Sequence, residues 1–267
     1  MKMLRSCTAA GMRLVALAAA MVCSNVHAAS FECDNATLAR AEKMICAHGD
    51  LGRLDSEMAL AFRRAQMLAR APAEVHASQR RWLAARNKCT EAACIARAYQ
   101  LRLSELRETP TAGWQQFNDP ATGLHFRYLG NRAVKQCTSD AGTDCFQLAG
   151  PGMAYGSEYF VRIELIDGSL ATVADSLWEK EGAGWVAAGR GNSRSSVEAF
   201  NGEGWQGLVA NTVCGIGDEH GFHGAAGECL TYVMSNGRRT VVMTTDGASG
   251  RDQETLATIR SVRIGDK

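Results

Sequence analysis

Cysteine is the residue type with the clearest chemical pattern in this 267-residue sequence. Eight of the ten cysteines follow one another as four pairs, and such thiols can form disulfides, hold a metal ion or supply a nucleophile. Which of these applies depends on whether the chain enters an oxidising compartment. The eight are Cys33, Cys46, Cys89, Cys94, Cys137, Cys145, Cys214 and Cys229.

The first 28 residues have the composition of a secretory signal. A basic start precedes an apolar run over residues 14–22, and residues 26–28 offer small residues at the positions that a signal peptidase recognises. The run is about half as long as a membrane-spanning helix, which needs about 20 residues. We predict a signal peptide over residues 1–28 and a periplasmic protein without a membrane span. The alternative is a lipoprotein anchored at Cys23, but Val22 occupies the position at which a lipidation signal needs Gly or Ala.

In an exported chain, an even number of cysteines indicates disulfides rather than metal thiolates. Cys89 and Cys94 can bridge locally across a turn. Cys33 and Cys46 can pair only if the chain between them folds back, because a continuous helix would hold them about 18 Å apart. Spacing alone leaves crossed pairing among these four cysteines open.

The last two cysteines enclose a loop, CGIGDEHGFHGAAGEC, that carries several titratable side chains. Three interpretations compete. Two histidines and a carboxylate could hold zinc, the loop could hydrogen-bond to the carboxylates of a glycosidase cleft, or it is a solvated connection stapled because it is long. The glycines fix no ligand geometry, so we predict no metal and no cofactor. The candidate partner-binding residues are Asp218, Glu219, His220 and His223.

Enzyme motifs are missing from the sequence. It contains no G-x-S-x-G turn, no H-E-x-x-H helix and no Gly-rich phosphate loop. Pairing of all eight cysteines would also remove a thiol nucleophile. We therefore expect a non-catalytic protein.

Charge and glycine content divide the chain after residue 108. Residues 29–108 hold 13 Lys and Arg against 10 Asp and Glu, a net charge of +3, whereas residues 109–267 hold 13 against 18, a net charge of −5. The second part is also rich in glycine. We predict a helical domain over 29–108, a linker over 109–116 and a second domain over 117–267. Neither part is basic enough to indicate nucleic-acid binding.

The first part has the apolar spacing of helices. Apolar residues recur every three or four positions over residues 51–68, which predicts a helix capped by Asp50 and ended by Pro72. A second helix follows, Thr90 caps a third, and a short helix over 39–46 precedes them all. Small Ala-rich helices bury little apolar area, so disulfides that contribute about 2–4 kcal/mol each are expected to replace the missing core.

The second part alternates polar and apolar residues, which predicts strands. Helical patterns over residues 169–182 and 252–264 interrupt and close this part, and Asn236-Gly237 suits a tight hairpin turn. The predicted class is therefore α+β, with an antiparallel sheet covered by at least two helices. The predicted strands lie at residues 123–129, 159–166, 204–214, 229–235 and 239–245.

Five elements of the helical part occur in a specific order: FEC (31–33), EKMIC (42–46), L-x-x-LD-x-x-M (51–58), QRRWL-x-x-R-x-x-C (79–89) and C-I-x-x-x-Y-x-x-R (94–102). Together they resemble the N-terminal domain of the LprI-like lysozyme-inhibitor family over residues 31–106. One departure is Ala39, where that family often has Ser or Thr. Within the elements, we expect Trp82 and Tyr99 to lie in the core, and Arg80 and Arg86 to be solvated or paired.

The second part resembles the PsbP-like α/β/α sandwich, through its opening DPATGLHFRYL, its GWQG turn and its final helix running into SVRI. That resemblance carries over no chemistry. The LprI-like resemblance implies a secreted, non-catalytic protein that inhibits lysozyme or a related peptidoglycan hydrolase. The alternative is an immunity or envelope-assembly module that binds a toxin or a membrane complex.

Overall fold

The computed structural model describes residues 29–139, 142–150, 153, 159–189, 192–213, 216–218, 221–223, 228–245 and 252–265. Residues 216–218 and 221–223 are described by their backbone. The predicted signal peptide, with Cys23, lies outside these ranges. Within them, no helix is both long and apolar enough to cross a bilayer.

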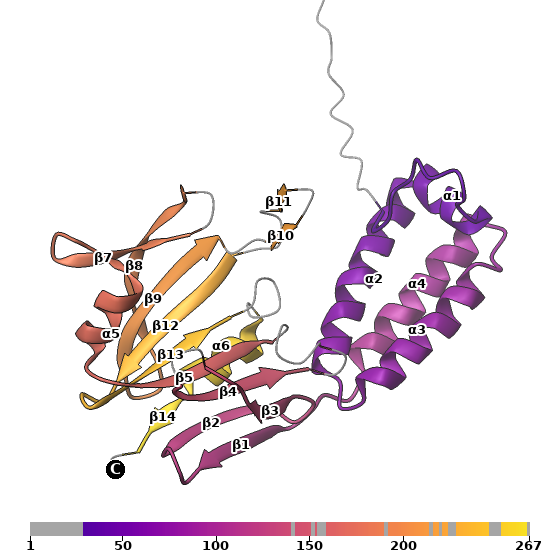
Figure 1. The fold of residues 1–267 in the computed structure, drawn as a ribbon. Coiled ribbons are helices and arrows are strands. Elements are labelled where there is room, and N and C mark those ends of the chain that lie inside the picture. Colours follow the sequence, from indigo (N-terminus) through magenta and orange to yellow (C-terminus); the bar gives the residue numbers. More distant parts are fainter. Residues whose placement is uncertain are drawn as a thin grey trace, which may run out of the picture.

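The first domain is a bundle of four helices (Figure 1). They are α1 (Arg40–Ala47), α2 (Gly49–Leu68), α3 (Pro72–Arg86) and α4 (Ala92–Arg107). The central helix α2 packs against each of the other three. Its apolar stripe includes the buried Leu51 and Met58, which meet Ile95 and Tyr99 of α4 in one core. The predicted helices are thus confirmed.

The ends of these helices differ from the predicted caps. The N-cap of α2 is His48, so Asp50 lies in the first turn, where its charge still favours the helix dipole. The N-cap of α4 is Glu91 rather than Thr90, because the helix begins one residue later than expected. Pro72 is the first residue of α3, a position where its missing N–H removes no helical hydrogen bond.

The second domain contains fourteen strands and two helices in the described residues, and every strand pairing is antiparallel. The helices are α5 (Leu170–Leu177) and α6 (Gln253–Arg260). The strands are β1 (Trp114–Asp119), β2 (Leu124–Leu129), β3 (Ala133–Gln136), β4 (Asp144–Ala149), β5 (Val161–Asp167), β6 (Glu179–Glu181), β7 (Gly184–Ala188), β8 (Arg194–Asn201), β9 (Gln206–Val213), β10 (Ile216–Asp218), β11 (Gly221–His223), β12 (Glu228–Ser235), β13 (Arg239–Thr244) and β14 (Arg263–Ile264).

These strands form three sheets. The largest has nine strands in the order β3-β4-β5-β13-β12-β9-β8-β7-β6, a second has the order β1-β2-β14, and β10 pairs with β11. Gly237 has a φ of 95° in the turn between β12 and β13, as the predicted Asn236-Gly237 hairpin requires.

Both faces of the nine-stranded sheet are covered. Successive residues of a strand point to opposite faces, and in β12 Tyr232 joins one core whereas Val233 joins another. The larger core lies between the nine-stranded sheet, β2 and α6, and includes Phe126, Ile163 and Ile259. The smaller core lies under α5. The predicted α+β class, a sheet covered by helices, is confirmed.

The sequence pattern missed seven strands of the two larger sheets, including β14, whose residues were expected to belong to the closing helix that ends at Arg260. Two physical reasons account for β4, β6 and β8. All three residues of β6 are exposed, and β8 is mostly exposed, so no apolar alternation marks them. Five successive residues of β4 are buried, so it shows no alternation either. The helix predicted over 169–182 ends at Leu177, and its last part turns into β6.

The domains meet at the C-terminal end of α2. The backbone N–H of Arg70 donates to Pro110 O over 2.9 Å, and that of Ala112 donates to Leu68 O over 2.7 Å. Asn131, in the turn between β2 and β3, donates through Nδ2 to the carbonyls of Met67 and Ala69 at 2.8 and 3.0 Å. Carbonyl groups at the end of α2, which have no partner inside the helix, are therefore satisfied by the segment after α4 and by the second domain.

Candidate protein-binding site

Disulfides fix the short connections in both domains. Cys33 pairs with Cys46, Cys89 with Cys94 and Cys137 with Cys145, at Cα–Cα distances of 5.7, 5.7 and 5.0 Å. The chain folds back between Cys33 and the last turn of α1, as their pairing requires. Cys229 is also disulfide-bonded. Its expected partner, Cys214, lies outside the described residues.

A buried polar network joins all four helices of the first domain. Asp55 and Arg86 are only 1% and 3% exposed, and their side chains lie 3.7 Å apart. Tyr99 donates its hydroxyl proton to Asp55 Oδ1 over 2.6 Å and accepts from Arg86 Nη1 over 2.9 Å. Ser30 donates to the other oxygen of Asp55, and Glu42 of α1 lies 3.5 Å from Arg86. Each buried charge therefore has a partner of opposite sign, as burial demands.

Burial and its hydrogen bond to Asp55 raise the pKa of the Tyr99 hydroxyl well above its usual value, although the nearby Arg86 lowers it. Burial has the larger effect on this pKa, because ionisation would place a phenolate in the core. Tyr99 therefore remains a neutral hydrogen-bond donor to Asp55 throughout the physiological pH range.

A second buried arginine connects α3 with α4. Arg102 donates through Nε to Gln79 Oε1 and through Nη2 to Ser78 Oγ, each over 2.9 Å. Trp82 donates its indole N–H to Ala98 O over 3.1 Å, which holds its ring against α4. The residues that carry the LprI-like resemblance thus hold the bundle together. Of the expected placements, Tyr99 is in the core, Trp82 is partly buried, Arg86 is paired and Arg80 is exposed.

The helix cap at Ala39 is half formed. Ala39 has no side-chain oxygen to accept a hydrogen bond, so the N-terminal N–H groups of α1 receive no cap from it. Glu42 makes the reciprocal half of a capping box, because its Oε2 accepts from the backbone N–H of Ala39 over 2.8 Å.

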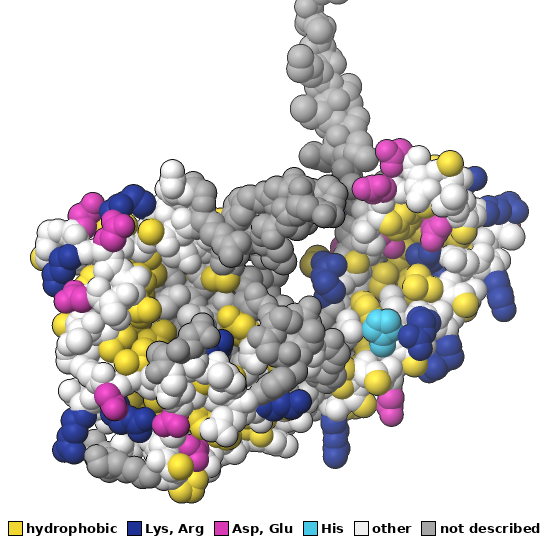
Figure 2. Space-filling model, viewed as in Figure 1, with side chains coloured by type: hydrophobic (Ala, Val, Ile, Leu, Met, Phe, Trp, Pro, Cys, Tyr) yellow, Lys and Arg dark blue, Asp and Glu magenta, His cyan; other side chains and the backbone are white. Residues whose placement is uncertain are grey.

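An apolar groove lies on the surface above this network. It has a volume of about 490 Å³ and is formed by α3, α4 and the Cys89–Cys94 disulfide. Trp82 and Leu101 line it, and Leu101 is 61% exposed. Arg97 also lines it, is exposed, and makes no hydrogen bond or ion pair with any described residue. In the space-filling view, the helical domain shows apolar side chains among exposed Lys and Arg (Figure 2).

The predicted binding loop is only partly described. Strands β10 and β11 pair within it, with Asp218 opposite Gly221 and Ile216 opposite His223. The backbone thus places Asp218 at one end of this ladder and His223 at the other. Glu219 and His220 lie outside the described residues. Among the residues that the structure does describe, no three His, Cys, Asp or Glu side chains gather as a metal site.

No protein-family model and no curated protein sequence matches the chain. Among solved structures, the solution structure of cyanobacterial PsbP (CyanoP) from Synechocystis sp. PCC 6803 is similar at 14% identity and a TM-score of 0.39, over 59% of this chain and 96% of that chain. A crystal structure from Bacteroides thetaiotaomicron VPI-5482 is similar at 13% identity and a TM-score of 0.29, over 57% of this chain and 49% of that one. The LprI-like resemblance has no matching family model.

Sequence reasoning did not find the groove or the buried ion pair. A signal for the pair was present, because Asp55 occupies the apolar stripe of α2 between Leu51 and Met58. A carboxylate at such a position needs a buried partner. The groove had no comparable signal, because it depends on how two helices and a disulfide pack.

Proposed function

We propose that this protein is exported and inhibits a lysozyme or a related peptidoglycan hydrolase by forming a stoichiometric complex. The observation that carries the proposal is the groove on α3 and α4, where the exposed Leu101 and the unpaired Arg97 lie beside Trp82. Energetically dominant residues of protein interfaces are enriched in Trp and Arg set in well-packed pockets.

Two arginines and two glutamates line the groove, and Arg97 is the side chain that suits an acidic cleft. A glycoside hydrolase places two carboxyl groups on either side of the bond that it cleaves. Arginine binds carboxylates through two parallel hydrogen bonds, and Arg97 has no competing partner among the described residues. In the proposed complex Arg97 pairs with a cleft carboxylate and Leu101 packs on the apolar wall of the cleft.

The groove is also held rigid before binding. The disulfide between Cys89 and Cys94 fixes the turn from α3 to α4, and the Trp82 hydrogen bond to Ala98 fixes the groove floor. A surface that is ordered in advance loses less conformational entropy on binding, so more of the contact energy appears as affinity.

The test is an inhibition assay with the mature protein, oxidised and purified from a periplasm. We expect a decrease in the rate at which a lysozyme clears a cell-wall suspension, saturating at one inhibitor per enzyme, for at least one enzyme of a panel of lysozymes and peptidoglycan hydrolases. Arg97→Glu and Leu101→Asp should each weaken inhibition about tenfold or more, the effect of losing about 1.4 kcal/mol.

Matched controls lie on α2. Leu60 is exposed to the same 61% as Leu101, and Arg63 is exposed and makes no interaction with the described residues. Leu60→Asp and Arg63→Glu should leave inhibition unchanged. Unaltered enzyme rates at a large molar excess of the protein, across the whole panel, would refute the proposal and leave the immunity or envelope-assembly alternative.

A further inference from the structure

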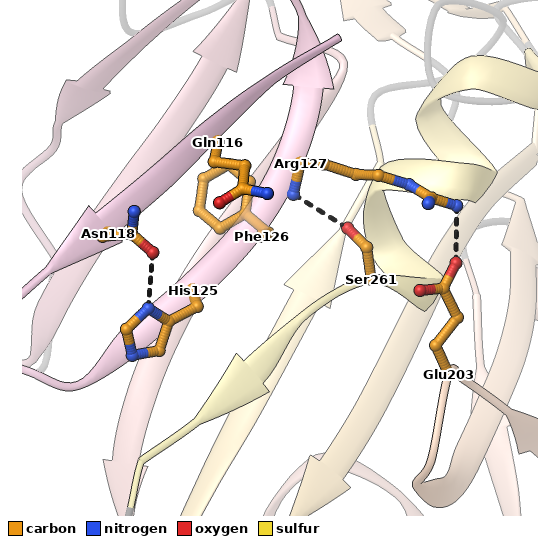
Figure 3. Close-up of a pocket in the computed structure, with 7 residues that line it drawn as sticks. All are labelled: Gln116, Asn118, His125, Phe126, Arg127, Glu203 and Ser261. Atoms are coloured by element: carbon orange, nitrogen blue, oxygen red, sulfur yellow. Dashed lines mark hydrogen bonds and ion pairs between the residues drawn. The ribbon is translucent and has the colours of Figure 1, made fainter.

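A second surface, in the other domain, has the composition of a ligand site. A pocket of about 250 Å³ opens on the exposed side of the small sheet, between β2, the end of α6 and the turn before β9 (Figure 3). Polar side chains dominate its lining, and all of them except Ser261 are exposed. The lining residues are Gln116, Asn118, His125, Phe126, Arg127, Glu203 and Ser261.

The sheet register places these groups on one face. Gln116 lies opposite Arg127, and Asn118 lies opposite His125, so the four side chains share the exposed side of β1 and β2. On the next strand, Arg263 pairs with His125 and extends the row. Side chains of the opposite face, such as Phe117 and Tyr128, pack against the large core. The side chains of the polar row therefore do not contribute to the hydrophobic core.

Hydrogen-bonding capacity remains unused in this row. The side chain of Gln116 makes no hydrogen bond with any described residue, so its carbonyl oxygen and its amino group are both available. Asn118 uses Oδ1 to contact His125 Nδ1 over 2.6 Å, which leaves its amino group. Figure 3 shows Gln116 between Asn118 and Arg127.

An exposed indole borders the row. Trp114 is 46% exposed, whereas the other four tryptophans, all within the described residues, are buried or partly buried. The guanidinium of Arg127 lies 5.4 Å from the centre of the Trp114 ring, so the ring stands next to the pocket. Tryptophan combines a large apolar face with an N–H donor and is enriched at interfaces.

The charges select the class of ligand. Glu203 pairs with Arg127 and lies 4.0 Å from Arg263 Nη2, so one carboxylate already contacts both guanidinium groups that an anion would need. One carboxylate and one imidazole among the seven lining residues are too few ligands for a metal ion. They are also too few carboxylates for glycoside hydrolysis, which uses two. What remains is a neutral molecule rich in hydroxyl groups.

We propose that this face binds a neutral oligosaccharide, with Trp114 stacking on the C–H face of one sugar ring. Hydroxyl groups donate and accept together, and so do the side-chain amides of Gln116 and Asn118, while Glu203 accepts and Arg127 donates. The pocket is smaller than the roughly 300–1,000 Å³ of typical drug-sized sites and accommodates one sugar ring. The other sugars of the oligosaccharide lie along the sheet. This site is independent of the proposed inhibitor groove, which belongs to the other domain.

The test is calorimetric titration of the full chain with two probes, tetra-N-acetylchitotetraose and maltotetraose, together with NMR of the indole N–H signals. We expect saturable binding of at least one probe and a shift of the Trp114 signal. Trp114→Ala and Gln116→Ala should each weaken that binding about tenfold or more, a loss equivalent to about 1.4 kcal/mol. Gln115→Ala is the control, because Gln115 lies on the same strand but on its other face, where it contacts Tyr128.

Three results would overturn the proposal. The first is no saturable binding of either probe, and the second is binding that both variants leave intact in a protein whose unfolding temperature is unchanged. The third is displacement of the sugar by millimolar inorganic phosphate, which would show that the arginines form an anion site. Because the inhibition assay uses the other domain, its outcome leaves this test unaffected.

Discussion

The interiors of the two domains differ in what fills them. The large core of the α+β domain is built from aromatic and branched side chains carried by β2, β4, β5, β12, β13 and α6. The helical domain has a smaller core with several alanines, and at its centre lie a buried ion pair and a buried tyrosine hydroxyl. Two of the three disulfides with both cysteines described belong to this smaller domain.

This difference shows how a small helical module can stay folded without a large apolar core. Hydrophobic stabilisation grows with the apolar area removed from water, and a domain of about 80 residues buries comparatively little. The helical domain compensates with cross-links and with a network that is stable only when all of its members are present. The α+β domain also has a buried ion pair, Arg132 with Asp252, but this pair lies beside a larger apolar core.

The largest expected effect comes from breaking the buried ion pair. Asp55→Ala should lower the free energy of unfolding of the helical domain by about 3–5 kcal/mol, because it leaves the charge of Arg86 buried and unpaired. Urea unfolding followed by circular dichroism measures this loss. In the α+β domain, Asp167→Ala removes one of the two carboxylates that pair with Arg239 but should cost less than about 1 kcal/mol, because the Asp167 side chain is 93% exposed. Similar losses in the two variants would show that the burial of the Asp55–Arg86 pair does not increase its contribution to stability.

The disulfides should give the next largest effect. Replacing Cys33 and Cys46 by serine should cost about 3 kcal/mol, and replacing Cys89 and Cys94 about 2 kcal/mol, from the loop lengths that they close. Both double variants should lower the unfolding temperature of the helical signal. Replacing Cys137 and Cys145 should leave the helical signal in place, because that bond closes a loop between β3 and β4. An intact helical transition in all three variants would show that the bundle does not depend on its cross-links.

The smallest effect is a change with pH. The pKa of Tyr99 is raised in the folded state, whereas an unfolded tyrosine ionises near pH 10. Above about pH 10 the unfolded chain releases this proton and the folded chain keeps it, so stability falls by up to about 1.4 kcal/mol per pH unit. Stability measured from pH 9 to 10.5 should therefore fall more steeply for the native protein than for Tyr99→Phe. Parallel profiles would mean that the Tyr99 hydroxyl ionises equally easily in both states.

Much of the fold could be predicted from particular residues. The apolar stripe from Leu51 to Leu68 predicted α2, and the five alternating segments of the second domain are each found as a strand. The strands that were missed, such as β4 and β6, are buried on both faces or exposed along their length, so their sequences lack a period of two. Of the candidate site, the sequence pointed to the cysteines and to the loop that ends at Cys229. It gave no indication of the groove at Leu101 or of the sheet face at Gln116.

By itself, the sequence determined where the helices form and which cysteines lie close enough along the chain to bond, because both depend on spacings of a few residues. It also determined the division into a basic helical part and an acidic, glycine-rich part. Only the tertiary structure decided that Asp55, Arg86 and Tyr99 meet, and that Glu203 and Ser261 border the side chains of β1 and β2. The residues in these contacts are separated by 13 to 134 positions in the sequence. No pattern of neighbouring residues predicts that they meet, because packing alone brings them together.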